Sequence, residues 1–218
     1  MRAHTLPSLT LIAGLLLGCS GGDDAPPEAM TLRDRLQTEL SVNLENDPDG
    51  VTVHSVVDLG TTQNDLDVLF GVSGGTMSLH TDAAGQILLT EVDADLSDIA
   101  ISPTAFPPDG LTITDIHAML EDPVVGPGDW SIDDQRVIAA VTGNLLVDWA
   151  VVQDTGEALP LVQQRVEGVE FAIDAQQDDI GAITVAVVAT RAGDFFTWSD
   201  LVTLSELSVL LHGTLPVR

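Results

Sequence analysis

The chain has 218 residues, and its 34 acidic side chains against seven arginines and no lysine give a formal net charge of -27 at pH 7. Nucleic acids and anionic lipid surfaces are bound mainly through cationic side chains, so this balance excludes nucleic-acid partners and unaided adhesion to acidic membranes. Aromatic residues make up only 4%, which disfavours a ring-lined carbohydrate cleft, and a single cysteine rules out a disulfide within the chain.

The first eighteen residues have the organisation of an export signal. Arg2 supplies a positive charge, the stretch from Leu6 to Leu17 is mostly apolar, and small residues close it. An apolar stretch of about a dozen residues is too short for a membrane-spanning helix, which needs about 20. We therefore expect residues 1–18 to be a signal peptide that is removed.

The segment Leu16-Leu17-Gly18-Cys19 resembles the lipobox of bacterial lipoproteins. The resemblance implies a lipid on the thiol of Cys19, cleavage just before it, and a durable membrane anchor once two or three acyl chains are attached. In this family an aspartate after the cysteine favours inner-membrane retention, and here Ser20 follows. The alternative is an ordinary signal peptide with an incidental cysteine, but no clear Ala-x-Ala site follows the apolar stretch. The sequence thus predicts a lipid-anchored protein of the bacterial cell envelope, in the outer membrane.

Residues 19–29 have no hydrophobic periodicity and are rich in glycine, proline and acidic residues. We expect them to form a flexible acidic tether. The remaining 189 residues, 30–218, are enough to bury a core without cross-links, so we expect a single domain there.

Leucines recur at every fourth residue at the start of this domain, at Leu32, Leu36, Leu40 and Leu44. This spacing places them on one face of a helix, and Thr31 is a candidate N-cap. The sequence predicts one amphipathic helix over about 31–44.

From Val51 onward apolar and polar residues alternate instead. The alternation is clearest in 65–72, 88–96, 137–151 and 183–189. A period of two is that of a half-buried strand. The sequence therefore predicts a mainly β fold, with long antiparallel strands in a strongly curved sheet or a β-sandwich.

A weak internal similarity organises the predicted strands. A new alternating segment begins thirteen or fourteen residues after each of three turn glycines, at 85, 156 and 193. Asp98, Gly168 and Glu206 stand directly before these segments. We interpret the unit as a hairpin whose second strand changes face at a bulge. The similarity fits a true duplication, and it also fits the chance likeness among the hairpins of any meander of long antiparallel strands.

No motif predicts a catalytic site, a cofactor or a metal. Gly71-Val72-Ser73-Gly74-Gly75 matches the nucleophile elbow of hydrolases, but strand-like alternation follows where the elbow needs a helix, so we interpret it as a turn and expect no enzyme activity. Glu45, Asp47 and Asp49 imitate the start of a calcium loop, but its twelfth position would be Val56, which cannot bind the ion.

The remaining polar and aromatic candidates have ordinary structural explanations. The paired acids at 133–134 and 178–179 are expected in solvated turns, since adjacent acids are common in so acidic a chain. The histidines lack the close spacing of zinc ligands and are expected at the surface or rim. We assign packing roles to the tryptophans. The histidines after the signal are His54, His80, His117 and His212, and the tryptophans are Trp130, Trp149 and Trp198.

Two functions suit these features. The first is a non-catalytic acidic β domain that contacts a protein partner or has a structural role in the envelope, with loops at 103–110 and 123–130 as contact sites. The alternative is a carrier or binding module for a lipid or another apolar ligand. Its outline resembles the half-barrel periplasmic lipid and lipoprotein carriers. A carrier needs a cavity that its own side chains do not fill, whereas a scaffold is packed solid.

Overall fold

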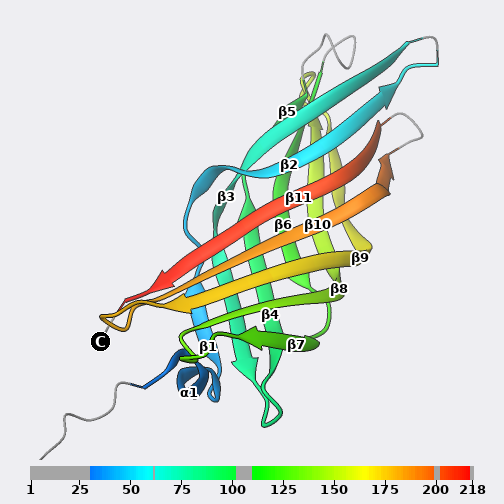
Figure 1. The fold of residues 1–218 in the computed structure, drawn as a ribbon. Helices are drawn as coiled ribbons and strands as arrows, with labels where there is room; N and C mark the ends of the chain where they lie inside the picture. The colour runs from blue at the N-terminus through cyan, green and yellow to red at the C-terminus, as the bar shows by residue number, and fades with distance from the viewer. Residues whose placement is uncertain (1–29, 61, 102–109, 199–201, 217–218) are drawn as a thin grey trace, which may run out of the picture.

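The computed structural model describes residues 30–60, 62–101, 110–198 and 202–216. Most of these residues belong to antiparallel strands, which Figure 1 shows wound into one barrel with a short helix at one end. The mainly β fold and the strongly curved antiparallel sheet predicted from the sequence are therefore confirmed. The sheet closes on itself instead of forming a sandwich.

The described chain begins with the helix α1 (Leu32–Leu36) and continues through eleven strands. The strands are β1 (Leu40–Asn43), β2 (Asp47–Asp58), β3 (Gln63–Thr81), β4 (Gln86–Leu96), β5 (Ile99–Ile101), β6 (Leu111–Leu120), β7 (Val124–Trp130), β8 (Arg136–Gln153), β9 (Ala158–Gln177), β10 (Ile183–Trp198) and β11 (Val202–Leu215).

These strands occupy 8 positions around the barrel, because some positions are shared by two strands in line. β1 and β2 lie along the same edge of β3, β4 and β5 along the same edge of β6, and β6 and β7 both lie between β4 and β8. Each position pairs with the next one along the chain, and β11 pairs with β2 to close the ring. The topology is thus an up-and-down barrel.

The helix predicted over 31–44 exists but is shorter. α1 ends at Leu36, and Leu40 begins the strand β1. A spacing of four fits a helix of 3.6 residues per turn, but it also fits a strand, because four is a multiple of the strand period of two. Leu40, Val42 and Leu44 are buried while the residues between them are exposed, which is the strand pattern.

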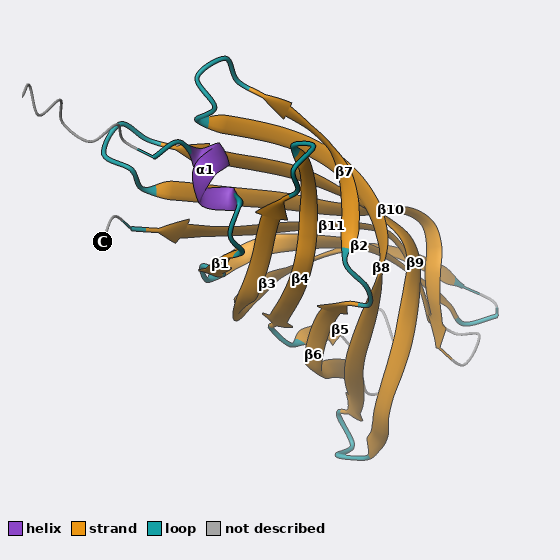
Figure 2. Cartoon of the chain, turned by 90° about the horizontal axis from the view of Figure 1, so that it is seen from below, coloured by secondary structure: helices purple, strands orange, loops and turns teal. Residues whose placement is uncertain are grey.

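α1 covers the end of the barrel where β1 begins (Figure 2). The predicted N-cap is confirmed, since the Asp34 backbone N–H donates to Thr31 Oγ1 at 3.2 Å. Leu32 and Leu36 are fully buried. The Arg35 guanidinium donates to the Gly181 carbonyl oxygen at 2.5 Å and so ties the helix to the β9–β10 turn. This end of the barrel is closed by protein.

Bulges in β6, β9 and β11 keep apolar side chains on the inner face. Asp115, Gly168 and Glu206 have left-handed backbones, with φ of 54°, 68° and 57°. The inward positions change parity at each of them, as between Val166 and Val169 in β9. The bulges predicted at Gly168 and Glu206 are confirmed, whereas Asp98, the third predicted position, lies in the break between β4 and β5. Gly193, which was predicted as a turn residue, lies at an irregularity inside β10 instead.

The alternation predicted over 88–96 is out of phase at its start. Leu89, and not Leu88, is fully buried. The pairing of β3 with β4 passes from Ser78 opposite Glu91 to Leu79 opposite Leu89 and skips Thr90. An extra residue in one strand reverses the facing of everything before it, which the alternation alone does not reveal.

Candidate functional site

An apolar cavity lies inside the barrel, farther along the strands from the end that α1 covers. The cavity has a volume of about 90 Å³. A single water needs roughly 10–15 Å³ of such volume, so the space is larger than an ordinary packing defect. Between α1 and the cavity the interior is filled by fully buried side chains such as Met77, Leu79 and Ile87.

Every strand position of the barrel contributes to the cavity wall. The contributions come from inward-facing residues, which are mostly aliphatic. One example from each position is Val53 (β2), Phe70 (β3), Ala94 (β4), Ile116 (β6), Leu145 (β8), Val166 (β9), Ala189 (β10) and Val209 (β11). The cavity is therefore a property of the closed barrel and of no single hairpin.

Most of the chain's few aromatic residues collect around this cavity. Phe70, Trp149, Phe171, Phe195 and Phe196 line it, although the whole sequence has only five phenylalanines and three tryptophans. Trp149 and Phe196 make an edge-to-face contact with ring centroids 4.5 Å apart. The prediction for Trp149 was packing alone. It is buried as expected, but one side of it faces a hollow.

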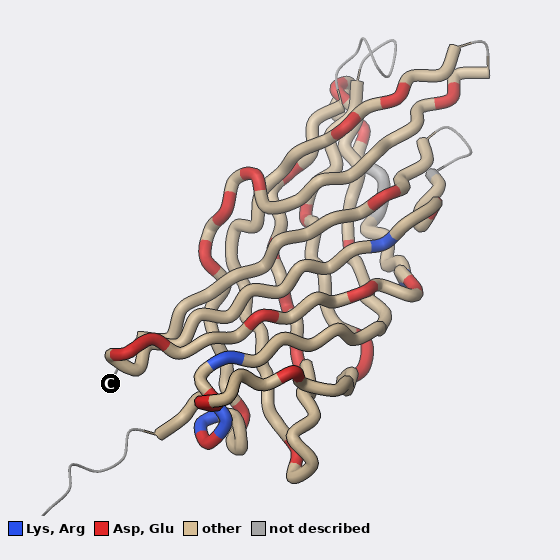
Figure 3. Tube along the Cα trace, viewed as in Figure 1, with Lys and Arg blue, Asp and Glu red and all other residues tan. Residues whose placement is uncertain are grey.

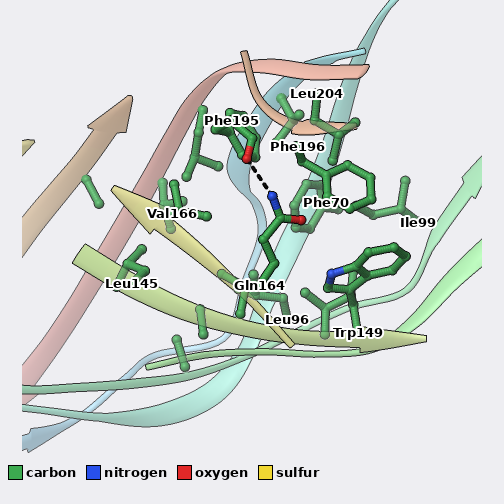
Figure 4. A pocket seen from close by; sticks show the side chains of 18 of the residues that line it. Phe70, Leu96, Ile99, Leu145, Trp149, Gln164, Val166, Phe195, Phe196 and Leu204 are labelled. Carbon is green, nitrogen blue, oxygen red and sulfur yellow. Dashed lines mark hydrogen bonds between the residues drawn. The ribbon is translucent and has the colours of Figure 1, made fainter. Parts of the chain in front are cut away.

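Among the described residues that line the cavity, Gln164 of β9 is the one whose side chain has a hydrogen-bond acceptor, since the indole N–H of Trp149 can only donate. Its Nε2 donates a hydrogen bond to the backbone oxygen of Phe195 at 2.7 Å. Figure 4 shows the amide reaching among the rings of Phe70, Phe196 and Trp149. Sequence analysis missed this residue. Its position two residues before the inward-facing Val166 could have identified it as a polar side chain on the inner face.

The barrel wall is incomplete beside Gln164. β9 and β10 are paired from Glu170 to Gln177 and from Thr190 to Ile183. The earlier part of β9 pairs with β8, and the later part of β10 pairs with β11. Residues 158–169 of β9 and 191–198 of β10 are thus not paired with each other, and we call this stretch the β9–β10 seam.

Two side chains bridge the β9–β10 seam. One is Gln164, through its bond to Phe195. The other is Arg191, whose Nε donates to the Glu167 backbone oxygen at 2.7 Å. Both bonds run from a side chain to a carbonyl oxygen, so they can break without disturbing a strand ladder.

The lining residues in the described part of the chain include no charged side chain, and the ion pairs lie on the outside of the barrel. Acidic residues are spread along strands and turns, and among the few arginines Arg33 and Arg35 lie together on α1 (Figure 3). Arg136 makes a two-point ion pair with Asp174 at 2.9 and 2.6 Å. The Arg165 guanidinium, 2.7 Å from Glu121, lowers the pKa of that carboxyl group. These pairs stabilise the outer surface and leave the interior neutral.

Comparison of the chain with family models, with curated proteins and with solved structures finds no match in any of the three. The functional argument therefore rests on the geometry of this barrel. In the described part of the chain, no helix has the length and apolarity needed to cross a bilayer.

The segment Gly71–Gly75 is not a turn, contrary to the prediction. It lies inside β3, and the pairing with β4 is irregular between Val72 and Gly74. Gly75 has a φ of 125°, and a Cβ there would lie 2.0 Å from the Asp93 backbone oxygen, so glycine is needed for close strand contact. Ser73 is exposed, and its hydroxyl group donates to the Asp95 backbone oxygen at 3.1 Å. β3 continues as a strand after it, where a nucleophile elbow requires a helix.

The acidic pairs lie in turns, as predicted. Asp133 Oδ1 accepts a hydrogen bond from Ser131 Oγ at 2.7 Å, which lowers the pKa of Asp133. Asp178 Oδ1 accepts from the Ala182 backbone N–H at 2.8 Å in the β9–β10 turn. Among the described residues no cluster of acids, histidines and cysteine could hold a metal ion.

Three histidines lie on the rim or outer surface beside acids. His54 and His117 place Nδ1 2.9 Å from Asp67 and Asp95, and His212 Nε2 is 3.4 Å from Glu45. The hydrogen bond to Asp67 raises the pKa of His54. The histidines are far from one another along different strands, so they do not form a common site.

Several predicted features lie outside the described residues. They are Cys19 with the signal and tether, most of the loop at 103–110, and the side chain of Trp198. The other loop predicted as a contact site, 123–130, is largely strand β7. Trp130 at its end packs against α1, with Arg33 5.3 Å above its ring, and its Nε1 donates to the Gly85 oxygen at 2.9 Å.

Proposed function

We propose that this chain is a bacterial lipoprotein whose barrel binds a lipid or another apolar small molecule in its cavity. The observation that carries the proposal is an apolar hollow lined from every strand position, within a barrel that is otherwise packed. Barrels of this strand number are just wide enough either to fill their interior with side chains or to hold one small ligand. The hollow supports the second case.

An empty apolar hollow is costly for a folded protein. Its lining atoms lose the dispersion contacts that a filled core provides, because water gains little in a cavity without polar partners. An apolar ligand restores those contacts. The rings of Trp149 and Phe196 offer such a ligand a broad contact surface. Small side chains elsewhere in the lining leave room for it, at Ala94, Ala118 and Ala189.

The lipid on Cys19 has a clear role in this proposal. A domain with this net charge is repelled by anionic head groups, so a covalent anchor is its means of staying near a membrane, where apolar molecules are concentrated. Membrane fractionation of the Cys19→Ala variant tests this part. We expect an unprocessed or mislocalised precursor, and normal processing and membrane association would contradict it.

Native mass spectrometry of the protein, purified without detergent, tests the binding function. We expect a population with an additional small-molecule mass that organic extraction removes. Ala118→Phe, which fills the cavity, should lose this mass, while Ala140→Phe on the exposed face of β8 should keep it. A bare mass together with no uptake of added apolar molecules would leave the protein-interaction or structural role as the better account.

A further inference from the structure

We propose that the cavity selects a neutral amphiphile whose hydroxyl group donates a hydrogen bond to Oε1 of Gln164, with its apolar body among the aromatic rings. This inference rests on the proposed function, since it specifies the ligand class of the same cavity. Gln164 is its centre because, among the described lining residues, it is the one whose side chain offers a hydrogen-bond acceptor.

The orientation of the Gln164 amide is fixed by its neighbour. The backbone oxygen of Phe195 can only accept a hydrogen bond, so the amide must direct Nε2 toward it, as the 2.7 Å contact shows. Oε1 therefore points the other way, among the rings (Figure 4). No hydrogen bond to Oε1 is found among the described residues. Oε1 is therefore a free acceptor to which a hydroxyl group of the ligand can donate.

A hydroxyl group suits this acceptor better than a charged group does. No acidic or basic side chain is found among the described residues that line the cavity, so a buried carboxylate or ammonium would have no counter-ion from them. The strongly negative chain also repels anions. A hydroxyl group needs one acceptor, and Gln164 supplies it.

The position of Gln164 sets the direction of the ligand. Its amide spans the β9–β10 seam, so the hydroxyl group lies at the wall of the barrel. The apolar body of the ligand then extends along the cavity toward Trp149 and Phe171, and across it toward the small residues Ala94 and Ala118. Val166, the next inward residue of β9, provides apolar contact on the same wall.

Displacement of the neutral fluorophore N-phenyl-1-naphthylamine from the full chain tests this proposal. Octan-1-ol and heptyl methyl ether are isomers that differ in the ability to donate a hydrogen bond, and octanoate adds a charge. Each is titrated into the native chain and two variants. Gln164→Leu removes the acceptor, and Gln163→Leu changes the exposed neighbour, whose Nε2 bonds Asp148 at 2.9 Å outside the cavity.

We expect the preference for the alcohol over the ether to fall by about 3- to 10-fold in Gln164→Leu, the usual range for one hydrogen bond. Gln163→Leu should keep the native preference for the alcohol. Octanoate should bind the native chain at least about 10-fold more weakly than the alcohol does. Because both isomers are compared in each variant, a general change in the affinity of the cavity for apolar molecules cancels.

The outcomes separate this proposal from the proposed function. If both isomers bind the native chain and their ratio is the same in Gln164→Leu, the hydroxyl assignment is wrong while apolar binding stands. If octanoate binds as tightly as the alcohol, the ligand class is wrong. If neither the fluorophore nor the isomers bind, the binding function itself fails.

Discussion

Ser55 is a polar side chain in apolar surroundings. It is fully buried on the inner face of β2 between Val53 and Val57, and its hydroxyl group has no hydrogen-bond partner among the described residues. An unsatisfied buried hydroxyl group costs about 1–3 kcal/mol. Ser78 is buried to a similar degree, but its hydroxyl group donates to Glu91 at 2.8 Å.

These two serines give a matched stability test. Ser55→Ala should raise the free energy of unfolding by about 1 kcal/mol, because it removes an unpaired polar group, and Ser78→Ala should lower it by about 1 kcal/mol. Urea denaturation of both variants measures the difference. A loss of stability in Ser55→Ala as large as that in Ser78→Ala would show that the Ser55 hydroxyl group has a partner.

His54 makes the stability of the folded protein depend on pH. Its hydrogen bond to Asp67 raises its pKa above 6.5, and Asp65 and Glu206 add smaller electrostatic contributions. A raised folded-state pKa means that the stabilisation is fully present below pH 6.5 and is lost as the pH rises through the folded-state value. The stability advantage over Asp67→Asn should therefore shrink as the pH rises above 6.5.

NMR titration of the His54 ring measures the pKa directly. Asp67→Asn should lower the midpoint more than Asp65→Asn does, since Asp67 makes the hydrogen bond and Asp65 acts only through its charge. Equal shifts in the two variants would contradict the assignment.

At the scale of single elements, the bulge in β11 stores backbone strain. Glu206 is exposed and holds a φ of 57°, which costs a residue with a Cβ about 1–2 kcal/mol. Glu206→Gly should raise the free energy of unfolding by about 1 kcal/mol at a pH above the measured titration midpoint of His54, where the ring is neutral. Glu170→Gly, in the extended part of β9, should lower it by about 0.5–1 kcal/mol. Denaturant unfolding checks both, and destabilisation by Glu206→Gly would contradict the left-handed bulge.

The elements differ in how far the sequence predicts them. Strands such as β8 and β10 follow from a period of two that runs along most of their length. The bulges at Gly168 and Glu206 follow from the parity change of their apolar residues. The boundary between α1 and β1 does not follow, because leucines four residues apart suit both a helix and a strand. The phase of β4 does not follow either, because Thr90 is an extra residue that only pairing with β3 reveals.

At the scale of the whole molecule, the closure of the barrel is the feature that alternation leaves open. It depends on pairing between β11 and β2, such as Val202 with Val57, which lie at opposite ends of the domain. The cavity is harder still to predict from the sequence, because it depends on the summed volume of side chains from every strand. Alternation of apolar and polar residues fits a solid scaffold and a hollow carrier equally, and only the three-dimensional packing favours the carrier.

The central claim is that the hollow inside the barrel binds an apolar molecule. Fluorescence titration with N-phenyl-1-naphthylamine tests it most directly, with the native chain, Ala118→Phe inside the cavity and Ala140→Phe on the outer face. We predict saturable binding to the native chain and to Ala140→Phe, and binding at least 10-fold weaker, roughly 1.4 kcal/mol, in Ala118→Phe. Equal binding by all three proteins, or no saturable binding by the native chain, would contradict the account.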